Sequence, residues 1–295
     1  MAREAPLVSI LVTVYNRESS VGETLSSVLR SDYCNFEVIV VDDCSSDGSQ
    51  AIVSAFAEGD KRIRVHRNER NLGDYPNRNK AASLAKGRYL KYVDSDDLIY
   101  PHGLSVMVAA MEANPDAVLG LAHSMPEEET PYPCYLQPHE AYRKQFLGRG
   151  CLSCGPTGAI IRRDAFEAAA GFCAEWDLLA DMELWYRLAA CAPVVLLPPG
   201  LVWWRRHSGQ EFERSGAVLQ YLQKGYELDR ETLLGLDCPL EKDERDTALA
   251  RRRQHVSRRL MSHAARNRAP GEAIRVFRGA DLSWRDLLAG LRRYR

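Results

Sequence analysis

Continuous apolar runs alternate with helical patterns along the first third of the chain. Strands without a polar face, such as LVSILVT and FEVIVV, are typical of a parallel sheet buried on both sides. The predicted strands lie at 7–13, 36–41, 63–66 and 88–93. Apolar residues at helical spacing predict helices at 19–31 (Val21, Leu25, Val28 and Leu29 behind a Ser cap), 49–58, 77–86 and 102–113. This β-α-β-α order predicts an α/β fold with a Rossmann-like, mostly parallel sheet and flanking helices.

The pattern changes in the middle of the chain. Residues 124–156 are Pro-rich and irregular (PEEETPYPCYLQP), which in a compact domain is typical of a functional loop. Regular structure is predicted to resume near GPTGAIIRR, to include an amphipathic helix at 178–191, and to reach the strand-like LVWWRRH. We expect one domain over 1–212, with halves 1–123 and 124–212, and a C-terminal helical extension over 213–295.

Charge is distributed unevenly along the chain. The formal net charge is −1, but residues 251–295 carry thirteen arginines and three acids, or +10, which leaves −11 for residues 1–250. The eight cysteines include one CxxC, Cys151 and Cys154, without the second pair of a zinc ribbon, so reduced thiols are expected. No leader opens the sequence, and no apolar run reaches the roughly 18 residues of a membrane span. These features predict a soluble protein inside the cell.

Three of the predicted strands end in polar clusters, TVYNR, DDCSSDGS and DSDD. Ligands of parallel sheets bind beyond the carboxyl ends of the strands, so the three clusters are expected to meet at one edge. The last cluster holds Asp94, Asp96 and Asp97, whose mutual repulsion requires a positive partner. Asp94 and Asp96 are spaced to bracket one hard cation and to leave sites for phosphate oxygens. The alternative is a cluster that caps a helix N-terminus.

The DDCSSDGS cluster joins the second strand to the next helix. A plain turn explains residues 45–48, whereas Asp42, at the very end of the apolar strand, is placed to accept hydrogen bonds from a ribose or a base. Neither GxGxxG nor GxxxxGK[ST] occurs in the chain, which argues against a dinucleotide-binding dehydrogenase and a P-loop kinase.

Seven stretches resemble one family in their order and spacing: VSILVTVYNR, FEVIVVDDCSSDGS, NLGDYPNRNKA, RYLKYVDSDD, GPTGAIIRR, LLADMELWYRLA and WWRRH. Over residues 7–210 the chain resembles the inverting glycosyltransferases of family 2, which have the type A glycosyltransferase fold. The resemblance implies transfer of a sugar from a nucleoside diphosphate sugar, with a UDP-sugar as the first expectation, to an acceptor hydroxyl in cell-surface glycan or glycoconjugate synthesis. It also implies that 1–123 binds the nucleotide sugar and that 124–212 forms the acceptor side.

The resemblance carries over residue by residue. It implies that the nucleotide sugar is bound by Thr13, Tyr15, Asn16, Asp42, Arg78, Asn79, Asp94 and Ser95. Asp94 and Asp96 match the Asp-x-Asp motif and imply a site for Mn²⁺ or Mg²⁺, with Asp96 as the more direct ligand. His207 matches a histidine that completes the metal site or contacts the diphosphate, and the alternative for it is an exposed side chain on a basic turn.

Asp181 matches the aspartate that acts as general base in the family. It would take the proton of the acceptor hydroxyl while the metal neutralises the departing diphosphate. The alternative for Asp181 is a polar residue on the wet face of a helix. The sequence departs from the family pattern at Ala180, where Glu is usual, which puts any role of that acid in doubt. It departs again at 74–76, where Asp, Tyr and Pro replace small residues and are expected to stiffen the donor loop.

The arginine-rich extension has several explanations. Basic amphipathic helices would bring the enzyme to an anionic membrane that carries a lipid-linked or polymeric acceptor, through Val256, Leu260, Ile274, Val276, Leu282, Leu287, Leu288 and Leu291. Alternatively, these helices pack on the catalytic domain or on a second subunit, as in a homodimer. Nucleic-acid binding is disfavoured because only Phe277, Trp284 and Tyr294 are aromatic after residue 250.

A catalytically inactive nucleotide-sugar-binding module is the remaining alternative, and the presence of Asp181 argues against it. The expected location is cytoplasmic, at the inner face of the cell membrane where the tail binds lipid.

Overall fold

The computed structural model describes residues 5–122, 130–206, 217–267, 270–279 and 282–291. The chain forms two compact units. The first, called the sheet unit, comprises Met1–Ala141 and Cys151–Arg205, and the second, called the helical unit, comprises Tyr142–Gly150 and Arg206–Arg295. The sequence-based boundary at residue 212 and the division at 123 stay predictions.

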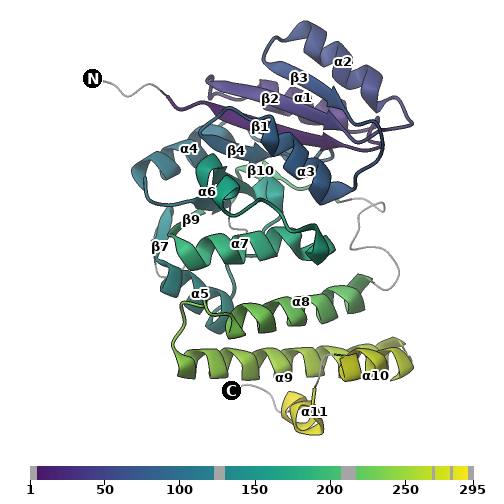
Figure 1. The fold of residues 1–295 in the computed structure, drawn as a ribbon, viewed down its shortest axis with the longest axis vertical. Coiled ribbons are helices and arrows are strands. Elements are labelled where there is room, and N and C mark those ends of the chain that lie inside the picture. Colours follow the sequence, from purple (N-terminus) through teal and green to yellow (C-terminus); the bar gives the residue numbers. More distant parts are fainter. Residues whose placement is uncertain (1–4, 123–129, 207–216, 268–269, 280–281, 292–295) are drawn as a thin grey trace. The chain divides into compact units, whose positions relative to one another are not determined.

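The sheet unit is built on an eight-stranded sheet within the described residues (Figure 1). Its spatial order is β3-β2-β1-β4-β8-β6-β9-β7. The strands are β1 (Val8–Val14), β2 (Phe36–Asp42), β3 (Ile63–Arg67), β4 (Tyr89–Tyr92), β6 (Leu119–Ala122), β7 (Cys134–Leu136), β8 (Ala159–Arg162) and β9 (Val194–Leu197). The run β3-β2-β1-β4 is parallel, as is β6-β9, whereas β8 and β7 pair antiparallel with their neighbours. β5 (Leu98–Ile99) and β10 (Val202–Trp203) form a separate antiparallel pair.

Helices cover the sheet, with α3 in front of the strands in the view of Figure 1. They are α1 (Val21–Leu29), α2 (Ser49–Gly59), α3 (Asp74–Ser83), α4 (Gly103–Ala113), α6 (Arg163–Ala168) and α7 (Ala180–Cys191), with the short 3-10 turns η1 (Pro156–Gly158) and η2 (Ala174–Leu179). Helix α5 (Pro138–Leu147) begins in the sheet unit, and its residues from Tyr142 onward belong to the helical unit. Of the predicted stripe of α1, Val21, Leu25 and Val28 are fully buried in one core with the alternate β1 residues 8, 10, 12 and 14, and Leu29 is partly buried against this core. Each such side chain contributes about 1.5–3 kcal/mol by its burial.

The predicted α/β sheet with flanking helices is confirmed, and the departures from the sequence prediction are local. Residues 124–156 are not one loop, because β7 and α5 lie within them. The strands β6, β7 and β9 were not predicted, since three or four residues carry no detectable period. Helix α3 begins at Asp74 rather than at residue 77, because Pro is tolerated in a first helical turn and Asp74 favours the positive end of the helix.

The helical unit contains α8 (Ala217–Leu234), α9 (Lys242–Asn267), α10 (Pro270–Gly279) and α11 (Trp284–Leu291). These helices enclose a small core of their own, made of Leu219, Tyr226, Val256, Leu260, Ala273, Val276 and Leu282. Four of the side chains that the sequence offered for membrane contact, at 256, 260, 276 and 282, are therefore buried within this unit. No helix in the described part of the chain is long and apolar enough to cross a membrane.

Candidate active site

The three polar clusters after β1, β2 and β4 are joined by hydrogen bonds, as the parallel order of these strands predicted. The backbone N–H of Asn16 donates to Ser45 Oγ at 3.0 Å, and that of Ser46 donates to Asn16 Oδ1 at 2.9 Å. Asn16 has φ 52°, a left-handed conformation in which asparagine is more common than most residues. Arg17 Nε donates to Asp96 Oδ2 at 3.2 Å, which links the first cluster to the third, and Ser20 Oγ, just after the first cluster, donates to the carbonyl oxygen of Ser95 at 2.9 Å.

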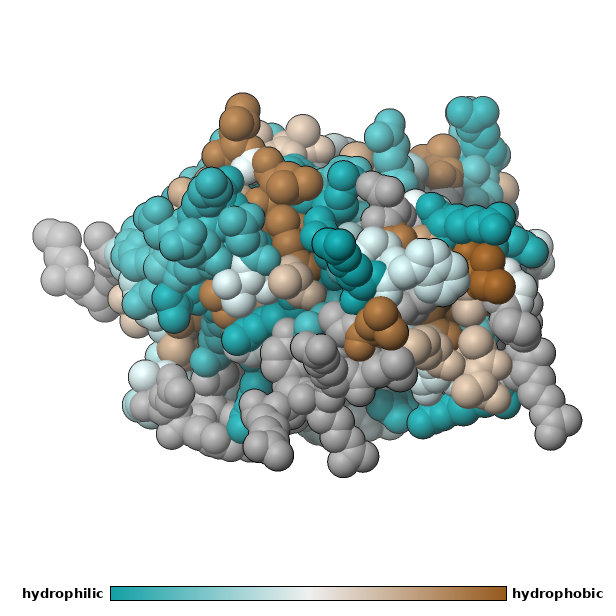
Figure 2. Space-filling model, turned by 90° about the horizontal axis from the view of Figure 1, so that it is seen from below, coloured by the Kyte–Doolittle hydropathy of each residue, from teal (hydrophilic) through white to brown (hydrophobic). Residues whose placement is uncertain are grey.

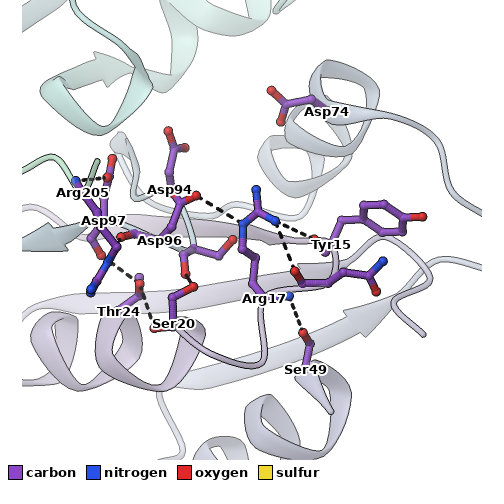
Figure 3. A network of polar contacts seen from close by, with 12 residues as sticks. Tyr15, Arg17, Ser20, Thr24, Ser49, Asp74, Asp94, Asp96, Asp97 and Arg205 are labelled. Carbon is purple, nitrogen blue, oxygen red and sulfur yellow. Dashed lines mark hydrogen bonds and ion pairs between the residues drawn. The ribbon is translucent and has the colours of Figure 1, made fainter. Parts of the chain in front are cut away.

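Arginines surround the acidic residues 94–97, so the cationic partner that the sequence required is supplied first by the protein itself (Figure 3). Arg78 Nη1 lies 2.6 Å from Asp94 Oδ1, and Arg17 Nε lies 3.2 Å from Asp96 Oδ2. Arg205 donates from Nε to the Asp96 carbonyl oxygen at 2.7 Å, and its backbone N–H donates to the Asp97 carboxylate at 3.0 Å. The acidic loop is therefore held by arginines from three parts of the fold, the segment after β1, helix α3 and the segment after β10.

The capping alternative for this acidic loop is wrong. The loop leads into the short strand β5, and the next helix, α4, begins only at Gly103. The predicted Ser cap of α1 is also not formed, because the Ser20 side chain makes no capping hydrogen bond and binds Ser95 instead. The three carboxylates thus pair with arginine side chains and with the Arg205 backbone rather than capping a helix.

A buried lysine lies beneath the acidic loop. Lys91, on β4, is fully buried, and its Nζ donates to the carbonyl oxygens of Tyr92 (2.9 Å) and Thr157. Burial lowers the pKa of Lys91 to about 8, against the opposing effect of Asp94 and Asp97. Burial likewise raises the pKa of Asp97 to about 7, and Asp94 adds to this rise.

Arg78 is the centre of a cluster of charged and aromatic side chains beside the acidic loop. It is buried, its Nε lies 2.9 Å from Asp74 Oδ1, and its guanidinium carbon lies 5.7 Å from the ring centre of Tyr75. The Tyr75 ring packs against Phe172 at 5.2 Å between centroids. The departures from the family pattern at 74–76 therefore have a structural use, because Asp74 and Tyr75 hold Arg78 toward Asp94.

Asp181 lies in the first turn of α7, where its Oδ1 accepts the N–H of Met182 at 2.7 Å. Burial raises the pKa of Asp181 to about 7, and the neighbouring charges of Asp94 and Asp74 also raise it, while the Met182 N–H and Arg78 oppose the rise. The residue is thus in the electrostatic field of the acidic loop and of Arg78. A carboxyl with a pKa near 7 is suited to accept a proton at neutral pH.

The residues implied for the nucleoside occupy different surroundings. Thr13 is buried near the end of β1, and Tyr15 is exposed just beyond it. Asp42 is fully buried, and its carboxylate accepts the N–H of Ser45 at 3.2 Å and lies 3.4 Å from Arg67 Nε. The protein itself therefore already satisfies part of the Asp42 carboxylate.

Two further expected contacts also have protein partners. Asn79 donates from Nδ2 to the carbonyl oxygen of Phe172 at 2.8 Å and accepts the Phe172 N–H at 2.9 Å, so its amide holds that backbone. Ser95 is buried and accepts from Ser20 through its carbonyl oxygen. His207 lies outside the described residues.

Several residues of the site had no assigned role in the sequence. Asp43 organises the loop before α3, because its carboxylate accepts the N–H groups of Leu72 (2.8 Å) and Gly73 (3.0 Å). Arg17, Lys91 and Arg205 were likewise unassigned. A signal existed for both Asp43 and Arg17, since Asp43 directly follows the apolar strand β2 and Arg17 lies three residues after the end of β1.

A divalent cation fits this donor set only with help from a substrate. In the described part of the chain, no three His, Cys, Asp or Glu side chains gather as a metal site. Asp94 and Asp96 are partly accessible, with side chains 25% and 16% exposed. Two carboxylates completed by phosphate oxygens and water are the usual donor set of protein-bound Mg²⁺.

Solved structures place the fold among the type A glycosyltransferases. The TarS 1–349 structure from S. aureus is 22% identical with a TM-score of 0.64, over 90% of this chain and 73% of that one. The mannosyltransferase PcManGT from Pyrobaculum calidifontis, solved with GDP-Man and Mn²⁺, is 19% identical with a TM-score of 0.64, over 97% of this chain and 79% of that one.

The family model for glycosyl transferase family 2 matches residues 9–169, and the chain belongs to this family. It is similar to the putative teichuronic acid biosynthesis glycosyltransferase TuaG of Bacillus subtilis, with 41% identity over 33% of this chain. It is also similar to the glycosyltransferase GlyG of Streptococcus pneumoniae, with 28% identity over 72% of this chain. The matched stretch spans 38% of TuaG and 76% of GlyG. The resemblance noted in the sequence is thereby confirmed.

Proposed function

We propose that the protein is an inverting glycosyltransferase that moves a sugar from a nucleoside diphosphate sugar to an acceptor hydroxyl. The observation that carries this proposal is the relation of Asp181 on α7 to the acidic loop after β4. The charges of Asp94 and Arg78 both act on the pKa of Asp181, which supports the proposal that the candidate base and the candidate diphosphate-binding groups share one site. Inversion requires the base to approach the sugar from the face opposite to the leaving group, because the acceptor hydroxyl enters there, and Asp181 is the proposed base on that face.

The donor side of the proposed site consists of charged and exposed aromatic groups. Tyr15 offers an exposed ring at the end of β1 for the base, and Asp42 and Thr13 lie next to it at the ends of paired strands. Arg78 is held beside Asp94, where a diphosphate would find a fixed positive charge. Asn79 supports this arrangement through the Phe172 backbone.

The acceptor side depends on Asp181. Its carboxylate would accept the hydroxyl proton as the oxygen attacks the anomeric carbon, a contribution of about 10² to 10⁴ in rate. Mn²⁺ or Mg²⁺, when held by Asp94 and Asp96, would neutralise charge on the departing diphosphate. His207 is the proposed third contact of this part of the site. Residues 124–212 are proposed as the acceptor half and 1–123 as the donor half.

The named relatives support the donor and acceptor classes. A TarS 1–349 structure contains UDP-GlcNAc, which supports UDP as the first nucleotide to test. TuaG is named for teichuronic acid biosynthesis, and WcaA of Escherichia coli, 41% identical over 35% of this chain, is named for colanic acid biosynthesis. A growing cell-surface glycan, free or lipid-linked, is therefore the proposed acceptor class.

A panel of nucleotide sugars tests this function. The protein with Mn²⁺ is expected to release nucleoside diphosphate from one UDP-sugar faster than from GDP-, ADP- and TDP-sugars, because the site around Asp42 and Tyr15 selects the base. Coupled detection of the released diphosphate measures this. If the protein binds a nucleotide sugar but never releases diphosphate with any acceptor, the inactive binding module becomes the better explanation.

The helical unit is proposed to contact an anionic membrane surface in the cytoplasm. Ile274 and Phe277 lie one turn apart on α10, Trp284 and Leu288 lie one turn apart on α11, and the rings of Phe277 and Trp284 are 5.5 Å apart. Three of these side chains are strongly exposed, at 49% (274), 75% (284) and 65% (288). Exposed arginines at 275, 278 and 285 flank this strip.

The exposed apolar residues are few. On the face shown in Figure 2, apolar side chains lie singly or in small groups among hydrophilic ones. Such a surface is suited to reversible binding that combines arginine charge with shallow insertion of Trp and Leu. A second copy of the chain on the same strip, a homodimer, is the alternative outcome.

Vesicle co-sedimentation distinguishes an anionic membrane from a second copy of the chain as the partner of this strip. The double substitution Trp284→Ser and Leu288→Ser is expected to lower binding to anionic vesicles several-fold, and the parent protein is expected to bind neutral vesicles weakly and to dissociate as salt rises. Leu236→Ser is the matched control, because Leu236 is a fully exposed leucine of the same unit outside the strip. Equal binding to both lipid types, with a concentration-dependent dimer, would favour the second copy.

A further inference from the structure

Arg17 is a charged residue at the acidic loop for which the proposed reaction has no role so far. It follows Tyr15 and Asn16 after β1, and its backbone N–H donates to Ser49 Oγ at 2.7 Å (Figure 3). Its Nε lies 3.2 Å from Asp96 Oδ2, and Nη1 donates to the carbonyl oxygens of Asn16 (3.2 Å) and Tyr15 (3.4 Å). The guanidinium is therefore held against the carboxylate that is the proposed direct ligand of the cation.

The two arginines that pair with the candidate metal ligands differ in how firmly they are held. Arg78, the partner of Asp94, is buried and also pairs with a second acid, Asp74. Arg17 is 36% exposed, and apart from Asp96 it contacts only neutral carbonyl oxygens. Its Nη2 has no hydrogen-bond partner among the residues that the structure describes. Arg17 is thus the one of the two that can turn to another anion.

We propose that Arg17 couples cation binding to donor binding, by neutralising Asp96 in the free enzyme and turning to the donor diphosphate when the donor arrives. This inference rests on the proposed donor and cation. A guanidinium and a divalent cation at one carboxylate repel each other, so Arg17 lowers the affinity of the free enzyme for the cation. A diphosphate accepts bidentate hydrogen bonds from a guanidinium, so the same residue raises the affinity for the nucleotide.

The coupling follows from these two effects. When Arg17 has turned to the diphosphate, one positive charge beside the Asp96 carboxylate is removed, and its affinity for a divalent cation rises. Linkage requires the reciprocal effect, so a bound cation also strengthens nucleotide binding. The enzyme would in this way hold its cation mainly when a donor is present.

Binary binding measurements on Arg17→Gln test the proposal, because the two expected effects have opposite signs. Removing the guanidinium should tighten Mn²⁺ binding to the nucleotide-free protein about tenfold and weaken UDP binding without metal about tenfold, as couplings between sites are typically of this size. Electron paramagnetic resonance of free Mn²⁺ follows the first, and titration calorimetry follows the second. Arg62→Gln is the charge-matched control, since Arg62 pairs with Asp60 at 2.7 Å outside the site, and it should change neither affinity.

Arg17→Lys separates charge from geometry. A lysine keeps the positive charge without the planar fork, so the variant should keep the weak Mn²⁺ affinity of the parent and lose part of the UDP affinity. The coupling is overturned if the Arg17→Gln protein stays folded in thermal melting but binds both Mn²⁺ and UDP more weakly, or binds both as the parent does. A purely structural role of Arg17 would change the two affinities in the same direction. If the parent binds both ligands, such a result leaves the proposed function standing. If the parent binds neither, the donor and cation assignments are wrong, and the coupling is wrong with them.

Discussion

Replacing Asp181 by asparagine is expected to lower turnover by about 10² or more and to leave donor affinity nearly unchanged. Asparagine keeps the shape of the side chain, but its amide cannot take the proton of the acceptor hydroxyl. The measurement is kcat with a saturating donor and acceptor, together with the Kd of the donor. Near-native turnover of Asp181→Asn would contradict the assignment, and His207 would then be the next candidate base.

The pH dependence provides a second test of the same residue. Because burial raises the pKa of Asp181 to about 7, kcat/KM of the parent enzyme should fall as the pH drops through about 7. The carboxylate must be ionised to act as a base, so the loss lies on the acid side. The residual activity of Asp181→Asn should lack this limb of the profile.

Stability should change in the opposite direction to activity. An aspartate whose pKa is higher in the folded than in the unfolded state destabilises the fold progressively between about pH 4 and pH 7 and fully above that range. Asp181→Asn removes this effect, so its Tm should exceed that of the parent at pH 8 and exceed it by less at pH 5. Glu175→Gln, an exposed carboxyl-to-amide change in η2 just before α7, is the control and should alter neither turnover nor Tm.

Excess chelator is expected to abolish sugar transfer, and Mn²⁺ or Mg²⁺ is expected to restore it. The reason is that the leaving diphosphate gains negative charge, and a divalent cation held by Asp94 and Asp96 would neutralise it beside Arg17, Arg78 and Arg205. Asp96→Asn should lose transfer and Mn²⁺ binding while its melting curve stays cooperative. Titration of Mn²⁺ into chelated enzyme, followed by diphosphate release, measures the dependence.

The control for this experiment is Asp32→Asn, which removes an exposed carboxylate that is not part of the acidic loop. It should keep both transfer and Mn²⁺ binding. Full transfer by the parent in excess chelator would show that the arginines alone neutralise the diphosphate. The roles of Asp94 and Asp96 would then be to orient Arg78 and Arg17 rather than to hold a metal.

The sequence alone was sufficient to predict the first strands of the sheet and the edge at which their polar ends meet. The apolar runs at 7–13 and 36–41 became β1 and β2, because a strand with no polar face has to be buried on both sides. Their polar ends had to meet, since parallel strands bring their carboxyl ends to one edge. The class of chemistry was therefore readable from the local pattern and from the order of seven short stretches.

Only the tertiary structure decided which groups are partners. Arg17 and Asp96 are 79 residues apart, and Arg205 and Asp96 are 109 apart, so no local periodicity connects them. Lys91 belongs to a strand in the sequence, and only the packing of Thr157 beside it turns it into a buried cation under the acidic loop. In the tail, the apolar positions at 256 and 260 were readable as an amphipathic face, but whether a membrane or neighbouring helices cover such a face depends on long-range packing. Local pattern determines which side chains must leave water, whereas the fold determines what they meet.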